Sequence, residues 1–200
     1  MFRKRPFKTV NSFLVVLILA ACSKATDSTD PIVGTWKATC VTVSSDTPYG
    51  SMTETIAANN TATMTSIAYS AAGCADSLKN FTVGLTVSWT KGAAVTGVDG
   101  AYNLDSTYSK VEFTIHTDAL VSQFNTAGAC GGGWTKDVAK EITATAASCT
   151  GFPKSGDKNY DIYKVDGTKL YFGDSSGGKD GSTADKRPTA LKTSLALDKQ

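Results

Sequence analysis

Residues 173 to 178 read Gly-Asp-Ser-Ser-Gly-Gly, a setting in which a serine hydroxyl can act as a nucleophile. Such chemistry needs a histidine that takes the serine proton, an acid that orients this histidine, and hydrogen-bond donors for the oxyanion. The chain contains a single histidine, His116. It shares period-two parity with Glu112 and Thr114, which predicts a surface position on the polar face of a sheet. The serines therefore lack a predicted base.

Two short matches bear on the same chemistry. Residues 173 to 178 resemble the stretch that carries the nucleophile in trypsin-like serine proteases, and residues 70 to 74, Ser-Ala-Ala-Gly-Cys, resemble the histidine segment of that family with glycine at the base position. Only 22 residues follow Gly178, too few for the strands that such enzymes have after this loop. Residues 173 to 187 are instead rich in Gly, Ser, Asp and Lys, as a surface loop is. We interpret the protease match as coincidence.

Other catalytic arrangements are not evident. Glu54, Glu112 and Glu141 are the only glutamates, and the aspartates fall mostly in turn contexts, so no paired acid and base stands out. Residues 131 to 134, Gly-Gly-Gly-Trp, lack the strand, lysine and helix of a phosphate loop. We therefore predict that the protein is not an enzyme and uses no cofactor and no metal.

The N-terminal residues predict export. A basic head precedes the apolar run Phe13 to Ala21, which is too short to cross a bilayer, since a spanning helix needs about 20 residues. This order is typical of a secretory signal. Leu19-Ala20-Ala21-Cys22 resembles the bacterial lipobox, which implies that Cys22 carries lipid and becomes the new N-terminus. The alternative is a plain secretory signal with a chance cysteine. Ser23 in place of aspartate resembles the pattern that sorts lipoproteins to the outer membrane of Gram-negative bacteria.

This interpretation divides the chain into a signal peptide at 1–21, an acylated cysteine with a polar tether at 22–30, and a domain at 31–200. The eight tether residues after Cys22 reach at most about 26–29 Å, so we expect the domain to lie close to the membrane. The signal holds four of the 20 basic residues and none of the 18 acidic ones, which leaves a net charge of −2. No clustered basic field remains for nucleic acid. We expect a monomer whose membrane contact is the lipid.

Four cysteines remain once Cys22 is assigned to lipid, namely Cys40, Cys74, Cys130 and Cys149. Three pairings are open. We prefer Cys40 with Cys74 and Cys130 with Cys149, because neighbours in sequence tend to be neighbours in an antiparallel meander. A zinc site is the competing interpretation, but it is weak because the chain has no C-x₂-C pair and one histidine.

Period-two alternation dominates from Ile32 onward and predicts an all-β domain. Phe81 to Trp89 alternates most clearly, and Asn59-Asn60 and Asp166-Gly167 mark hairpin turns. With a two-residue turn at 166–167, Tyr163 would face Leu170. One short helix is expected at 118–124, capped by Thr117. The other predicted strands are 34–43, 52–57, 62–69, 93–98, 111–115, 141–147, 160–165, 168–173 and 191–197. About eight to ten short strands with polar turns favour an antiparallel barrel or sandwich.

Gly34-Thr35-Trp36, preceded by Pro31-Ile32-Val33, resembles the Gly-x-Trp start of lipocalin barrels. The resemblance implies an up-and-down barrel in which Arg187 packs on Trp36 and closes one end. It also implies a binding site for a small hydrophobic ligand lined by Trp36, Phe81, Trp89, Phe113 and Tyr163. The alternative function is a non-catalytic envelope module that binds or inhibits a protein or glycan partner through its loops. A filled barrel would favour that alternative, and a cavity of a few hundred Å³ would favour the carrier.

Overall fold

The structure, a computed structural model, describes residues 30–42, 49–142 and 152–200. Its regular elements are nine strands, one α-helix and short 3₁₀ turns within these ranges. They are β1 Gly34–Val41, β2 Tyr49–Ile56, β3 Thr61–Tyr69, η1 Asp76–Leu78, β4 Lys79–Ala94, β5 Tyr102–Ile115, α1 Asp118–Thr126, η2 Ala129–Gly131, β6 Lys140–Glu141, β7 Lys158–Asp166, β8 Lys169–Gly173, η4 Ala184–Lys186 and β9 Leu191–Lys199.

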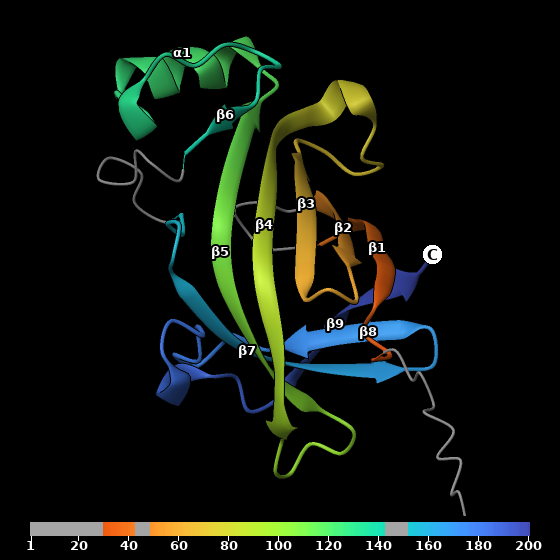
Figure 1. The fold of residues 1–200 in the computed structure, drawn as a ribbon. Coiled ribbons are helices and arrows are strands. Elements are labelled where there is room, and N and C mark those ends of the chain that lie inside the picture. Colours follow the sequence, from red (N-terminus) through yellow and green to blue (C-terminus); the bar gives the residue numbers. More distant parts are fainter. Residues whose placement is uncertain (1–29, 43–48, 143–151) are drawn as a thin grey trace, which may run out of the picture.

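The strands form a closed antiparallel barrel. Its hydrogen-bonded order is β4-β3-β2-β1-β9-β8-β7-β5, and β5 pairs with β4 to complete the ring. Apart from β1 and β9, which close the ring as the first and last strands, every neighbour is also the next long strand in the sequence, so the connection is up and down (Figure 1). The two-residue strand β6 lies outside the ring and pairs with the C-terminal end of β5. The prediction of an all-β up-and-down barrel with one short helix is confirmed.

The long strands β4 and β5 extend beyond the ring toward α1 (Figure 1). Sequence alternation predicted β4 as two strands, 81–89 and 93–98, and only the second half of β5, at 111–115. Register shifts between Thr86 and Val87 and between Lys91 and Ala94 explain the difference. A bulge inserts one residue and reverses the parity that follows, so a continuous strand looks interrupted in the sequence. The helix begins where predicted, and Thr117 Oγ1 accepts a hydrogen bond from Leu120 N at 3.3 Å.

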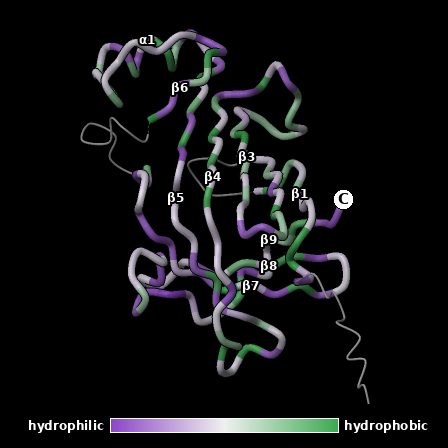
Figure 2. Tube along the Cα trace, viewed as in Figure 1, coloured by the Kyte–Doolittle hydropathy of each residue, from purple (hydrophilic) through white to green (hydrophobic). Residues whose placement is uncertain are grey.

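Two hydrophobic clusters fill the molecule. The first lies inside the ring and includes Ile32, Trp36, Trp89, Tyr163 and Leu170. The second packs beneath α1 on the extension of β4 and β5, and consists of Val111, Phe113, Ile115, Cys130, Trp134 and Ile142. Hydrophobic and hydrophilic residues are interspersed along the strands rather than separated into long blocks (Figure 2), as expected when one face of each strand is buried.

Two hairpins test the turn predictions. The hairpin at Asn59-Asn60 is confirmed, since Ile56 pairs with Ala62 and Asn60 has a φ of 64°. The register at 166–167 differs from the prediction: Tyr163 pairs with Phe172, not Leu170, because Asp166 still belongs to the ladder and pairs with Lys169. The turn residues are Gly167 and Thr168, with glycine at the first central position and a φ of 59°, as a type II′ turn requires.

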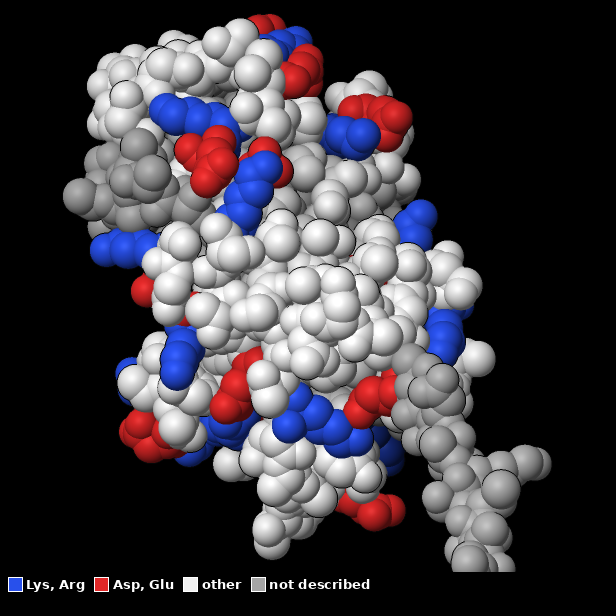
Figure 3. All heavy atoms as spheres, viewed as in Figure 1, with Lys and Arg blue, Asp and Glu red and all other residues white. Residues whose placement is uncertain are grey.

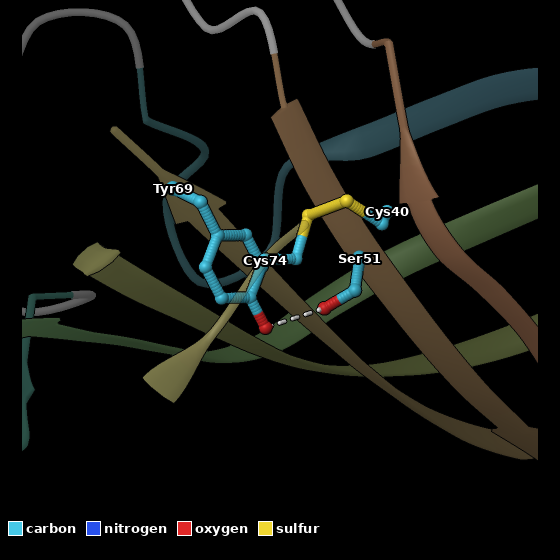
Figure 4. Close-up of a disulfide and its surroundings, with 4 residues drawn as sticks. All are labelled: Cys40, Ser51, Tyr69 and Cys74. Atoms are coloured by element: carbon cyan, nitrogen blue, oxygen red, sulfur yellow. Dashed lines mark hydrogen bonds between the residues drawn. A yellow bond between two sulfur atoms is a disulfide. The ribbon is translucent and has the colours of Figure 1, made fainter. Parts of the chain in front are cut away.

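One predicted disulfide is present. Cys40 and Cys74 are bonded, with their Cα atoms 5.5 Å apart, and the bond ties β1 to the loop after β3 (Figure 4). The sequence predicted that Cys40 and Trp36 point to the same side, but a register shift between Ala38 and Val41 interrupts the alternation there. Beside the disulfide the hydroxyls of Ser51 and Tyr69 are hydrogen-bonded at 3.2 Å. Cys149 lies outside the described residues, so the pairing of Cys130 with Cys149 stays a prediction.

Candidate ligand-binding cavity

The barrel encloses a cavity of about 360 Å³. Most apolar residues of its wall belong to the first cluster or pack on it. Leu85, also in the wall, packs on the second cluster, so the cavity lies between the two clusters. The exposed Ser175 and the half-buried Lys192 belong to the lining, so the cavity reaches solvent beside these two residues. Its main apolar lining residues are Met52, Ala62, Met64, Leu85, Val87, Leu104, Phe172 and Leu195.

Strand register explains why these residues converge. Glu54 of β2 pairs with Met64 of β3, and Met64 pairs with Leu85 of β4. Residues at paired positions point to the same face of a sheet, so one inward residue on each strand makes a ring around the interior. Leu104 of β5 pairs with Asp161 of β7 in the same way. The ring therefore brings two carboxylic acids, Glu54 and Asp161, into an apolar wall.

Glu54 is the unusual member of this wall. It lies on β2 between the inward-facing Met52 and Ile56 and lines the cavity. Among the described residues none donates a hydrogen bond or offers a cation to its carboxyl. Burial raises its pKa from 4.5 to about 8, and the charge of Asp161 adds to the effect. The carboxyl is therefore largely protonated at neutral pH.

Asp161 is held by the backbone. Its Oδ1 accepts hydrogen bonds from Ile162 N at 2.7 Å and from Gly173 N at 3.1 Å. Burial still raises the pKa of Asp161, against these hydrogen bonds and the nearby charge of Arg187. Gly173 is required here, because a Cβ at this position would collide with the Asp161 carboxylate and with Pro188. The first residue of the Gly-Asp-Ser-Ser-Gly-Gly stretch thus positions a carboxylate in the cavity wall.

None of the five predicted ligand-binding residues lines this cavity. Phe81 and Phe113 instead stack on each other in the second cluster, with ring centroids 5.1 Å apart, and Trp134 meets Phe113 edge-on at 5.5 Å. The reason is that the N-terminal end of β4 and the C-terminal end of β5 extend beyond the ring, so the aromatic residues there face α1 rather than the interior of the barrel.

The other three fill the first cluster. Trp36 is fully buried and donates its indole N–H to Ile32 O at 2.7 Å. Tyr163 is also buried and donates its hydroxyl to Asp30 Oδ1 at 3.0 Å, and Asp30 forms an ion pair with Lys91 at 2.7 Å. Trp89 is buried with its indole N–H unpaired. These rings therefore fill part of the barrel interior. Asp30, which was predicted to belong to the tether, is attached to the barrel by its hydrogen bond and ion pair.

The predicted contact between Arg187 and Trp36 is not present in the structure. Lys199, not Arg187, lies over the Trp36 ring, at 5.1 Å. Arg187 stacks on Tyr160 at 5.3 Å, donates to Asp161 O at 2.6 Å and pairs with Asp105 at 2.6 Å. It precedes β9, and this places it beside β5 and β7 instead of β1.

His116 is less isolated than predicted. Its Nδ1 lies 2.7 Å from Asp137 Oδ1 and its Nε2 lies 2.8 Å from Thr82 Oγ1, the order of groups in a nucleophile, base and acid triad. Thr82, however, lies inside β4, which pairs with β3 and β5 on its two edges. Backbone N–H groups around it serve those ladders and cannot also bind an oxyanion. The three side chains connect β4, β5 and the segment before β6.

The cavity carboxylates were visible in the sequence as violations of parity. Glu54 falls on the same face as Met52 and Ile56, and Asp161 on the same face as Tyr163. A charged residue on the buried face of a strand marks a functional or structural exception. The face that each acid occupies on its strand, rather than the number of glutamates, carries this signal.

Comparison with known proteins adds no relative: no protein-family model matches the chain, and no curated protein sequence matches it significantly. Within the described residues no helix is both long enough and apolar enough to span a bilayer. The same residues contain no group of three or more potential metal ligands. The face drawn in Figure 3 carries basic and acidic side chains in small mixed groups around a wide uncharged area. The cavity is thus the main feature from which function can be argued.

Proposed function

We propose that this protein is a lipid-anchored lipoprotein of the bacterial outer membrane whose barrel binds a small hydrophobic ligand. The cavity carries the ligand part of this proposal. Its volume of about 360 Å³ lies within the range of about 300–1,000 Å³ that small-molecule sites occupy. Most of its wall is apolar, and a few polar groups interrupt it, which is the usual composition of such a site.

The anchor part rests on the sequence of residues 1–22 and on two structural observations that support it. The disulfide between Cys40 and Cys74 is typical of an oxidising compartment outside the cytoplasm. Asp30 is bonded to Tyr163 and Lys91, so the domain begins one residue before its expected start and the tether from Cys22 is short. A barrel held close to a membrane could exchange apolar ligands with it.

The alternative, a protein- or glycan-binding module, receives less support. Among the described residues Val138 is the exposed large hydrophobic side chain, at 54% exposure. Protein-binding surfaces concentrate aromatic and other large apolar groups at their centres. A non-catalytic role fits both functions, because Thr82, the hydroxyl beside His116, lies on β4, whose backbone pairs with β3 and β5.

The ligand proposal is tested by native mass spectrometry of the full chain purified from its own envelope. We expect the wild type to retain a small molecule. Leu195→Trp should lose it, because the indole would fill the cavity that Leu195 lines. Ser194→Trp places the same side chain on the exposed face of β9 and is the matched control. A wild type without adduct, or equal retention by both variants, would contradict the proposal.

A further inference from the structure

The cavity contains a carboxyl group that the fold itself does not use. Glu54 lines the cavity, yet it makes no hydrogen bond and no ion pair within the described part of the chain. Its side chain is half-buried, and the carboxyl retains accessible surface toward the cavity space. A carboxyl that faces a cavity and has no protein partner is available to a ligand that donates to it.

A second acid strengthens the negative character of the wall. Asp161 lines the same cavity, and its charge is felt at Glu54. Both backbone donors to Asp161 bond Oδ1. Its other oxygen, Oδ2, accepts no hydrogen bond among the described residues, so it too can receive a donor from a ligand.

The remaining titratable and charged groups around Glu54 do not neutralise this site. Tyr108 of β5 lines the cavity, and burial, with the charges of Asp161, Asp157 and Glu54, raises the pKa of its hydroxyl, so it stays neutral. Lys192 of β9 lies at the solvent side and forms no ion pair with either acid. Arg187 lies behind Asp161 and is engaged by Asp105 and two backbone carbonyls. The neighbours of Glu54 on β1 and β3 are Trp36 and Met64.

We propose that the cavity selects an amphiphilic amine, whose apolar body packs on Met52, Met64 and Leu195 and whose ammonium group is received by Glu54 and Asp161. This inference rests on the proposed ligand-binding function and adds the chemical class of the ligand. An ammonium group donates up to three hydrogen bonds, and its positive charge complements the two carboxyls. A carboxylate ligand such as a fatty acid would instead place a third acid beside them.

Binding of an amine should release a proton. The amine enters as a cation, because an alkylammonium resembles a lysine side chain and keeps its proton well above neutral pH. Glu54 is largely protonated in the empty barrel at pH 7, since burial raises its pKa to about 8. The carboxyl must ionise to pair with the ammonium, so the affinity for the amine should rise about tenfold per pH unit between pH 6 and 7. A neutral ligand of the same length should show no such dependence.

The test compares three probes of equal length by calorimetry with the full chain in detergent: hexylammonium, 1-hexanol and hexanoate, each corrected by titration into detergent alone. We expect hexylammonium to bind the wild type about tenfold more tightly than 1-hexanol, and hexanoate most weakly. Only hexylammonium should give a heat that varies with the ionisation enthalpy of the buffer, which reports the released proton.

Glu54→Gln should weaken hexylammonium binding toward the affinity of 1-hexanol, with Asp161 keeping part of the preference. Unchanged 1-hexanol binding would show that the barrel is folded. Glu112→Gln, on the outer face of β5 in an ion pair with Lys110, is the matched control and should behave as the wild type. If 1-hexanol or hexanoate binds the wild type as tightly as hexylammonium, the amine inference fails and the carrier function stands. If no probe binds and no native ligand is retained, the proposed function itself fails.

Discussion

Glu54 is a half-buried acid on the cavity wall whose raised pKa bears on both the proposed ligand and the stability of the barrel. The carboxyl lies near methionines on the inner face of β2. Its partial removal from water there disfavours the charged form. An apolar residue there would stabilise the empty barrel more. The acid therefore costs stability in the absence of a ligand, and a ligand that pairs with it would recover part of this cost.

The cost predicts a pH dependence. The native state holds the Glu54 proton up to a pKa of about 8, whereas the unfolded chain releases it near 4.5. Because the native state binds more protons in this window, the free energy of unfolding falls as the pH rises from about 4.5 to 8, by an amount of the order of 3–5 kcal/mol. Asp161, whose pKa is also raised, contributes in the same direction.

Urea unfolding at pH 5, 6, 7 and 8 measures this dependence. Glu54→Gln should flatten the decline and raise the stability of the ligand-free protein at pH 8, because it removes the ionisable group and keeps a side chain of similar size. Glu112→Gln should retain the wild-type decline. An unchanged slope in Glu54→Gln would show that this carboxyl is not buried in its acid form.

At the scale of elements, the disulfide between Cys40 and Cys74 lies where the inward and outward alternation of β1 side chains is interrupted. The register of β1 shifts between Ala38 and Val41, and both cysteines have positive φ angles, 51° and 49°. Such backbone is unfavourable for a residue with a Cβ and persists where surrounding contacts hold it. The bond connects this part of β1 to the loop that leads toward β4.

Removing this bond should lower the free energy of unfolding by about 3–4 kcal/mol, the value expected for a loop closed across 34 residues. Cys40→Ser/Cys74→Ser and each single variant should lose the same amount, because any of the three removes the cross-link. Urea unfolding in the absence of reductant gives the measurement. A loss below about 1 kcal/mol in the double variant would show that barrel closure alone constrains these segments.

Elements were predictable where alternation is unbroken and less so where the register shifts. Residues 61–69 and 158–166 keep their parity and were found within two residues at each end. The bulges in β4 and β5 reverse parity, so the length of these strands, and with it the position of Phe81 and Phe113 under α1, was not readable. Large aromatic residues were assigned to the ligand because of their type, whereas the observed cavity is lined mainly by smaller and more flexible side chains.

At the scale of the whole molecule, closure follows from the meander. Eight strands joined in sequence order leave two edges, and the pairing of β1 with β9 removes both. This contact is short, Trp36 with Lys199 and Lys37 with Asp198, and Lys199 also lies over the Trp36 ring. The Gly-x-Trp segment therefore lies at the seam of the barrel.

The attachment of this barrel to a membrane is the property that the N-terminal sequence predicts. Several acyl chains on Cys22, each contributing about 0.8 kcal/mol per buried CH₂, would make the anchor effectively permanent. Cys22→Ala should therefore move the protein from the membrane to the soluble fraction on cell fractionation. Ser23→Asp keeps the acylated cysteine and should stay in membranes, but shift from the outer to the inner one. Membrane association of Cys22→Ala without acylation would refute the lipobox interpretation, and the cavity would then have to obtain its ligand from solution.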